Sequence, residues 1–216
     1  MALIITLAHE KGGVSKTTLA LNLQGYFRRS GHSCIVVDGD PQGSTTELFK
    51  AFGSQPGWNE VSFLSRKEYR NFEELPGKLS GHDIALIDTP PYFSSELAHA
   101  LAISHLVLVP CKASLVDFLA INKTLDILDL ECRKRPALRV AVVLTQTIAG
   151  TDFAQTIRKH LEKYGFPILK AELGNRVCFA RAWMNGPSVF EGTGNPKAQA
   201  DIEAIGSELI DLLANP

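Results

Sequence analysis

The chain has 216 residues, of which 45% are hydrophobic and 21% are charged, and its formal net charge is −1. These values are typical of a folded protein with a sizeable core, and we expect one domain spanning residues 1–216. A net charge so close to zero excludes a global field that attracts nucleic acid, so any contact with DNA has to come from a local patch.

The cysteines and the apolar segments indicate the compartment. The four cysteines are widely spaced, and no C-x-x-C pair occurs. This spacing argues against zinc and iron–sulfur sites and favours a reducing, cytoplasmic environment. The first residues lack the basic segment of a signal peptide, and no apolar run approaches the roughly 20 residues that span a bilayer. We therefore predict a cytoplasmic protein without a membrane segment.

The first pattern along the chain is a strand, a glycine-rich turn and a helix. Residues 3–8 form an apolar run typical of a buried parallel strand, and residues 17–29 repeat apolar side chains at helical spacing. Backbone N–H groups in such a turn form an anion nest at the positive end of the helix, so the pattern predicts a phosphate-binding P-loop. The residues expected to bind ATP are Lys11, Gly12, Gly13, Val14, Ser15, Lys16, Thr17 and Thr18.

Two residues of this loop have defined roles, and two others depart from the common motif. Lys16 supplies a positive charge to the terminal phosphates, and the hydroxyl of Thr17 is a ligand for Mg²⁺. The pattern G-x-x-x-x-G-K-[ST] has glycine where this chain has Glu10 and Ser15. If the backbone at Ser15 needs a positive φ, its side chain costs on the order of 1 kcal/mol. We expect nucleotide binding to survive.

Lys11 is an additional cation at the entrance of the loop. The pattern K-G-G-x-x-K-[ST]-[ST] is the deviant Walker A motif, and through it the chain resembles the ParA/MinD family of P-loop ATPases. The resemblance implies that Lys11 has a catalytic role, because in that family the corresponding lysine reaches the partner's ATP across a nucleotide-sandwich homodimer. It also implies that the protein binds ATP with Mg²⁺.

A second apolar run, residues 34–37, ends in two carboxylates, Asp38 and Asp40, within the string D-G-D-P-Q-G. Ligands of open α/β sheets bind at the carboxyl ends of the strands, and carboxylates there can hold the hydration shell of Mg²⁺ and orient an attacking water. The string also resembles the ParA pattern, which implies that Asp40 positions the water and Asp38 helps to hold the metal. The alternative is a solvated turn.

A third apolar run, residues 84–87, leads into Asp88-Thr89-Pro90-Pro91. A strand that ends in aspartate downstream of a P-loop is the Walker B arrangement, so we expect Asp88 to contact Mg²⁺, mostly through water. The two prolines stiffen a loop that is placed to sense the γ-phosphate. Between these motifs we expect a short helix at 44–52, a loop at 53–57 and partly helical structure at 69–79, and the sequence supports no functional assignment for residues 44–80.

The second half continues the alternation of strands and helices. Further strands are expected at 106–110 and 139–145, a strand or a turn begins at 165–169, and helices are expected at 115–132, 151–164 and 196–213. The apolar residues of the helix at 115–132 are Leu115, Phe118, Leu119, Leu125, Leu128 and Leu130. They either pack on the core or contribute to a dimer interface. The basic run at 133–135 is either the solvated end of this helix or a DNA contact.

Arg176 and Arg181 are the candidate DNA-binding residues. They follow from the resemblance, because ParA-like proteins place basic residues and dimer contacts in this region. The alternative is two surface arginines beside a buried cluster of Val177, Phe179 and Ala180. The segment at 186–191 is similar to the family's G-x-S-V-x-E pattern, which leads into the last helix.

The last helix helps to choose among the relatives. A membrane-recruited, MinD-like protein needs a C-terminal amphipathic helix with a basic face, whereas residues 196–213 carry four acidic side chains. We expect this helix to dock on the core. The chain also begins almost directly at its first strand, which leaves no room for a helix-turn-helix. It therefore resembles the small ParA type, which lacks its own operator-binding domain.

The sequence predicts an α/β P-loop NTPase with a mostly parallel, twisted sheet and helices on both faces. The resemblance implies an ATPase for DNA partition. ATP would close a homodimer that binds double-stranded DNA without sequence preference and associates with the nucleoid. A ParB-like, centromere-binding partner would stimulate slow hydrolysis.

Three alternatives are open at this stage. A related ATPase could position a protein cargo instead of DNA. The second alternative is a small-molecule ligase or kinase of the same fold, similar to dethiobiotin synthetase. Such an enzyme needs a pocket for its acceptor substrate and does not require Lys11. A nucleotide-dependent scaffold that does not hydrolyse ATP is suggested by Ser15.

Overall fold

The computed structural model describes residues 1–69, 71–150, 152–191 and 195–214, with the backbone alone at 115–119 and 182. The expected helix start at Thr151 lies outside these residues. The same holds for the expected packing of the Leu115, Phe118 and Leu119 side chains.

The described residues form one sheet of seven strands in the order β3-β2-β4-β1-β5-β6-β7, and every neighbouring pair is parallel. The strands are β1 Leu3–Leu7, β2 Cys34–Asp38, β3 Ser62–Leu64, β4 Ile84–Asp88, β5 Leu106–Lys112, β6 Arg139–Thr147 and β7 Ile168–Gly174. The predicted parallel α/β sheet is therefore confirmed.

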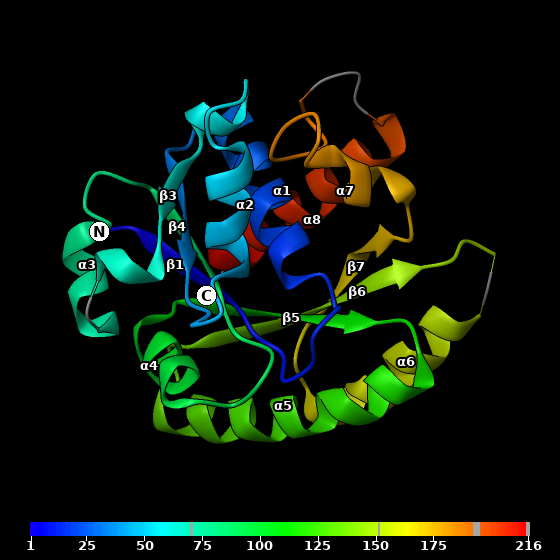
Figure 1. The fold of residues 1–216 in the computed structure, drawn as a ribbon. Helices are drawn as coiled ribbons and strands as arrows, with labels where there is room; N and C mark the ends of the chain where they lie inside the picture. Colours follow the sequence, from blue (N-terminus) through cyan, green and yellow to red (C-terminus); the bar gives the residue numbers. More distant parts are fainter. Residues whose placement is uncertain (70, 151, 192–194, 215–216) are drawn as a thin grey trace.

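Helices cover both faces of this sheet (Figure 1). They are α1 Lys16–Arg29, α2 Ser44–Phe52, α3 Leu75–Lys78, α4 Ser95–Ile103, α5 Leu115–Lys134, α6 Phe153–Leu161, α7 Val177–Ala182 and α8 Pro196–Ala214. Helices α1 and α8 pack on one face, and α4, α5 and α6 pack on the other. Alternate residues of the central strands enter the two cores, which is why these strands are continuous apolar runs.

The register of the central strands brings the expected site residues to one edge. Asp88, at the end of β4, pairs with Leu7 of β1 on one side and with Asp38 of β2 on the other. The P-loop follows β1 directly, so the loop, Asp38 and Asp88 all emerge at the carboxyl ends of adjacent strands. The topology thus assembles three motifs that are far apart in the sequence.

Among the described strands and α-helices, three were not expected from the sequence: β3, α4 and α7. Strand β3 is a three-residue edge strand and α7 is a helix of six residues, so neither is long enough for a periodic apolar signal. The N-terminus of α4 is capped by Ser94, whose hydroxyl accepts from the Leu97 N–H at 3.3 Å.

Helix α8 docks on the core, as its composition predicts. Ile202, Ile205 and Leu209 are fully buried. Its acidic residues cover the outer edge of β7, because Glu208 accepts from the N–H groups of Lys170 and Ala171 at 2.8 and 2.7 Å. These bonds satisfy an edge strand that would otherwise expose unpaired donors. Within the described ranges, no helix is both long enough and apolar enough to span a bilayer.

The contact between α8 and α1 depends on a glycine. A Cβ atom added to Gly206 would lie 2.3 Å from the ring of Tyr26 on α1. We predict that Gly206→Ala lowers the free energy of unfolding by about 1–3 kcal/mol, the usual cost of overpacking. Urea denaturation measures the change.

Gly77→Ala is the matched control, because a Cβ atom there meets no atom within 4 Å. It should leave the stability unchanged or raise it slightly. A Gly206→Ala protein as stable as the parent would contradict the described packing of α8 on α1.

Candidate nucleotide-binding site

The backbone of the P-loop is left-handed at Ser15, a conformation that is unfavourable for a residue with a side chain. Ser15 has φ 78° and ψ 23°, so the left-handed backbone expected at this position occurs on a residue with a side chain. Gly13, two residues earlier, has φ 74°. The carbonyl of Ser15 accepts from the Leu19 N–H at 2.9 Å, so the loop passes directly into α1.

Lys16 lies inside the site, with 7% of its surface exposed. Its Nζ donates to the backbone carbonyls of His9 at 3.2 Å and Lys11 at 3.0 Å. Burial lowers the pKa of Lys16, while the nearby carboxylates of Asp88 and Asp40 act in the opposite direction. The ammonium group thus stands at the floor of the loop, where it can meet a phosphate.

Asp88 accepts two hydrogen bonds on one oxygen. Its Oδ2 accepts from the hydroxyls of Thr17 at 2.6 Å and Thr45 at 2.7 Å. Burial raises the pKa of this carboxyl group to about 6. In the described part of the chain, the second oxygen, Oδ1, is buried and has no hydrogen-bond partner. An unpaired carboxylate oxygen beside two hydroxyls fits Mg²⁺ or its bound water, so Thr17 and Asp88 would hold the metal.

The two carboxylates that follow β2 have different positions. Asp38 is fully buried, and its Oδ2 accepts from the N–H and the hydroxyl of Thr46 at 2.8 and 2.5 Å. Its Oδ1 accepts from the Asp40 N–H at 3.1 Å, so Asp38 ties the loop to the first turn of α2. Asp40 lines the pocket, which suits the expected role of orienting a water molecule. The expected role of Asp38 as a metal residue stays a prediction.

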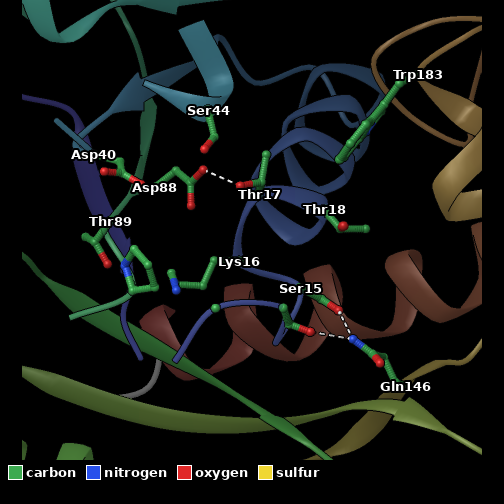
Figure 2. A pocket seen from close by; sticks show the side chains of 13 residues that line it. Ser15, Lys16, Thr17, Thr18, Asp40, Ser44, Asp88, Thr89, Gln146 and Trp183 are labelled. Atoms are coloured by element: carbon green, nitrogen blue, oxygen red, sulfur yellow. Dashed lines mark hydrogen bonds between the residues drawn. The ribbon is translucent and has the colours of Figure 1, made fainter. Parts of the chain in front are cut away.

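These residues surround a pocket of about 310 Å³. Figure 2 shows Lys16, Thr17 and Asp88 in its interior, with Asp40 and Trp183 at opposite ends. Of the expected nucleotide residues, Gly12, Gly13, Ser15, Lys16, Thr17 and Thr18 line it. Lys11, Val14 and Asp38 are not among its described lining residues. The buried Val14 instead contributes its carbonyl, which accepts from Thr145 at 3.1 Å.

Several lining residues were missed at the sequence level. They are Ser44, Gln146 and Trp183, whereas Thr89 and Pro91 belong to the loop that was expected to sense the γ-phosphate. Thr45, which binds Asp88, was missed as well. Gln146 lies at the carboxyl end of β6, where the rule for α/β sheets could have found it. The indole N–H of Trp183 is buried and has no hydrogen-bond partner in the described chain, so it is a donor available to a ligand.

The candidate DNA-binding residues differ in their surroundings. The guanidinium of Arg176 forms a bidentate ion pair with Asp201, at 2.7 and 2.9 Å, whereas Arg181 is exposed on α7. In the basic run after α5, Arg133 pairs with Asp129 and Lys134 with Glu131. These partners reduce the positive charge that Arg176 and the basic run can offer to a phosphate backbone.

The expected apolar groups beside these arginines and on α5 are only partly buried. Phe179 is 7% exposed, but Val177 is 67% exposed and Ala180 is also exposed, so they form no buried cluster with it. On α5, Leu125 and Leu128 are buried, which supports core packing, whereas Leu130 is 56% exposed.

Comparisons with known proteins agree with this geometry. Residues 5–189 match the family described as the CobQ/CobB/MinD/ParA nucleotide binding domain. The maintenance of carboxysome distribution protein A of Halothiobacillus neapolitanus is 27% identical over 211 residues, which cover 97% of each chain. The chromosome-partitioning ATPase Soj of Thermus thermophilus is 28% identical over 219 residues, which cover 87% of each chain.

A solved structure has the same fold. It is a Borrelia burgdorferi protein that is assigned to plasmid partition and bound to AMPPNP, with a TM-score of 0.75 and 20% sequence identity. The alignment covers 98% of the present chain and all of that chain.

We predict that Lys16→Ala raises the Kd for ATP–Mg²⁺ by about 100-fold or more, because it removes the charge-assisted bonds to the phosphates. Isothermal titration calorimetry measures the affinity. Lys50→Ala is the control, because Lys50 is an exposed lysine of α2 that pairs with Glu47. Retained affinity in Lys16→Ala would defeat the assignment of the phosphate site.

The raised pKa of Asp88 predicts a stability change that depends on pH. The pKa is about 6 in the folded chain and about 3.9 in an unfolded one, so the ionised carboxylate destabilises the nucleotide-free protein above pH 6. Asp88→Asn keeps an oxygen acceptor without the charge. It should stabilise the protein at pH 8 by on the order of 1–3 kcal/mol, and this gain should shrink as the pH falls from 6 to 4.

Urea denaturation between pH 4 and pH 8 measures this gain. Asp152→Asn, at an exposed position, controls for the change in net charge. A gain that does not depend on pH, or a loss of stability at pH 8, would contradict the described environment of Asp88.

Proposed function

This chain belongs to the CobQ/CobB/MinD/ParA family of nucleotide-binding ATPases, and from that premise we propose that it is a DNA partition ATPase. In the proposed cycle, ATP and Mg²⁺ close a homodimer that binds double-stranded DNA without sequence preference. A centromere-binding partner then stimulates slow hydrolysis, and the dimer separates. The proposal places the protein in the cytoplasm, on the nucleoid in its ATP state.

The observation that carries the proposal is the contrast between the two lysines of the P-loop. Lys16 lies inside the pocket of its own chain, whereas the half-buried Lys11 is not among the described lining residues. The carbonyl of Lys11 is held by Lys16, and its N–H donates to Nδ1 of His9 at 2.9 Å. The backbone of Lys11 is therefore fixed, which suits a side chain that serves the nucleotide of a second copy.

The hydrolytic step would use Asp40. This carboxylate lines the pocket, and its Oδ1 accepts from the Gln42 N–H at 2.9 Å, which fixes its orientation. A carboxylate held in this way can accept a hydrogen bond from water and align it with the terminal phosphate. Bound Mg²⁺ would neutralise charge that develops on the phosphate oxygens. The fixed position of Asp40 supports slow hydrolysis over a non-hydrolysing scaffold.

Of the proposed steps, DNA binding has the fewest candidate residues. With Arg176 paired to Asp201, the exposed Arg181 is the better candidate for a phosphate contact. Such contacts are electrostatic, so binding should weaken as salt is added. The partition proteins of Thermus thermophilus and Borrelia burgdorferi support DNA as the cargo.

A protein cargo is the second candidate. It is supported by the carboxysome distribution protein of Halothiobacillus neapolitanus, which matches the present chain over 97% of both lengths. Both candidates share the ATP cycle and the dimer. They differ in the partner that stimulates hydrolysis, which is a centromere-binding protein in one case and an adaptor on a protein assembly in the other.

The proposed dimer is tested by its mass in solution. We expect a monomer with ADP–Mg²⁺ and a dimer with ATP–Mg²⁺ in multi-angle light scattering. Lys11→Ala should remain monomeric with ATP, while its ATP affinity changes by less than about fivefold, because Lys11 is not among the described residues that line its own pocket. Asp40→Ala should bind ATP and stay dimeric after the parent protein has returned to monomer.

Lys123→Ala is the matched control, because Lys123 pairs with Glu10 beside the same loop. It should dimerise like the parent. If Lys11→Ala dimerises and hydrolyses ATP normally, the role of Lys11 across the dimer is wrong. If Asp40→Ala hydrolyses ATP at the parental rate, Asp40 does not position the water.

A further inference from the structure

Two residues in the described chain combine a side chain beyond Cβ with a left-handed backbone, and they contact each other. Ser15 has φ 78° and Gln146 has φ 54°, whereas every other described residue with a positive φ is glycine. The Nε2 of Gln146 lies 3.2 Å from Oγ of Ser15. An unfavourable backbone conformation persists only where the surrounding structure holds it. The contact between Ser15 and Gln146 is therefore a candidate for the interaction that holds it.

The conformation of Gln146 follows from an irregularity in β6. Thr145 pairs with Leu173 of β7 and Thr147 pairs with Gly174, so one residue of β6 has no counterpart on β7. Such a bulge bends the strand and redirects the side chain of the additional residue. Here the redirected side chain belongs to Gln146, and it meets the P-loop instead of continuing the pairing with β7.

The end of β6 holds three consecutive residues of the P-loop. Nε2 of Gln146 donates to the carbonyl of Gly13 at 2.7 Å as well as contacting Ser15 (Figure 2). The hydroxyl of Thr145 donates to the carbonyl of Val14 at 3.1 Å. A phosphate nest requires backbone N–H groups that point at the anion, and fixing the carbonyls of the same loop from outside favours that arrangement.

We propose that Gln146 is a positioning residue that keeps the P-loop in its anion-binding conformation and thereby compensates for serine in place of glycine at position 15. Glycine would adopt φ 78° at no steric cost, whereas serine favours a right-handed or extended backbone. The bonds from Gln146 bias Ser15 and Gly13 toward the nest before the nucleotide arrives. The function of Gln146 therefore depends on the residue at position 15.

This dependence separates positioning from direct contact with the nucleotide. Gln146 also lines the pocket, so it could instead touch the base or the ribose. A direct contact would contribute equally whether residue 15 is serine or glycine. A positioning role would lose most of its effect once glycine removes the steric cost.

The test is a double-mutant cycle on the Kd for ADP–Mg²⁺, measured by isothermal titration calorimetry. We expect Gln146→Ala to weaken binding about tenfold in the parent protein, because it removes the two hydrogen bonds from this side chain to the P-loop. Ser15→Gly alone provides the second background, and its own Kd is the reference for the double variant. In the Ser15→Gly background, Gln146→Ala should weaken binding by no more than about twofold.

Three further measurements make the result decisive. Gln146→Met keeps the length of the side chain without its donor and should reproduce Gln146→Ala, which covers the case of a poorly folded alanine variant. Gln155→Ala, at an exposed position on α6, should leave the affinity unchanged. Titration with GDP–Mg²⁺ should show that Gln146→Ala weakens both nucleotides by the same factor.

Two results would overturn the proposal. One is no loss of affinity in Gln146→Ala and Gln146→Met, which would leave the glutamine without a role in the loop. The other is an equal loss with serine and with glycine at position 15. If that equal loss also differs between ADP and GDP, Gln146 contacts the base directly.

Discussion

The carboxylate of Asp88 joins the segments that surround the nucleotide pocket. It stands at the end of β4 and accepts hydrogen bonds from Thr17 at the start of α1 and from Thr45 at the start of α2. A buried charge requires such partners, so the P-loop helix and α2 are both fixed to the central sheet through one oxygen atom. The second oxygen has no partner in the described chain and is available for the metal.

The other polar groups of the site support this arrangement from adjacent strands. Asp38, which pairs with Asp88 across the sheet, fixes the first turn of α2 through Thr46, so that Asp40 alone of the two carboxylates lines the pocket. From the opposite side, β6 holds the P-loop through Thr145 and Gln146. The site is thus assembled at the carboxyl ends of four strands.

The motifs and the central strands could be predicted from the sequence because each has a local pattern. The strand before the P-loop is apolar on both faces, and Asp88 ends a similar run. Continuous apolar runs are typical of parallel sheets, so the sequence could predict that these strands belong to one. Trp183 and Thr45 could not be placed, because their roles arise from contacts between distant segments. The position of Gln146 at the end of a strand was predictable, but its contacts with the P-loop were not. The partner of Arg176 is likewise 25 residues away on α8, and no local pattern indicates that Asp201 neutralises it. Short elements such as β3 and α7 escape prediction because they contain too few residues to show a period.

The central claim is that the nucleotide state of this pocket controls an interaction with DNA. The most direct measurement is the binding of a labelled random-sequence duplex by fluorescence anisotropy without nucleotide, with ADP–Mg²⁺ and with ATP–Mg²⁺, each at two salt concentrations. The account predicts binding only with ATP–Mg²⁺, and weaker binding at the higher salt concentration. Absence of DNA binding in all three states, in a protein that still binds ATP, would contradict the partition function and favour a protein cargo or a small-molecule substrate.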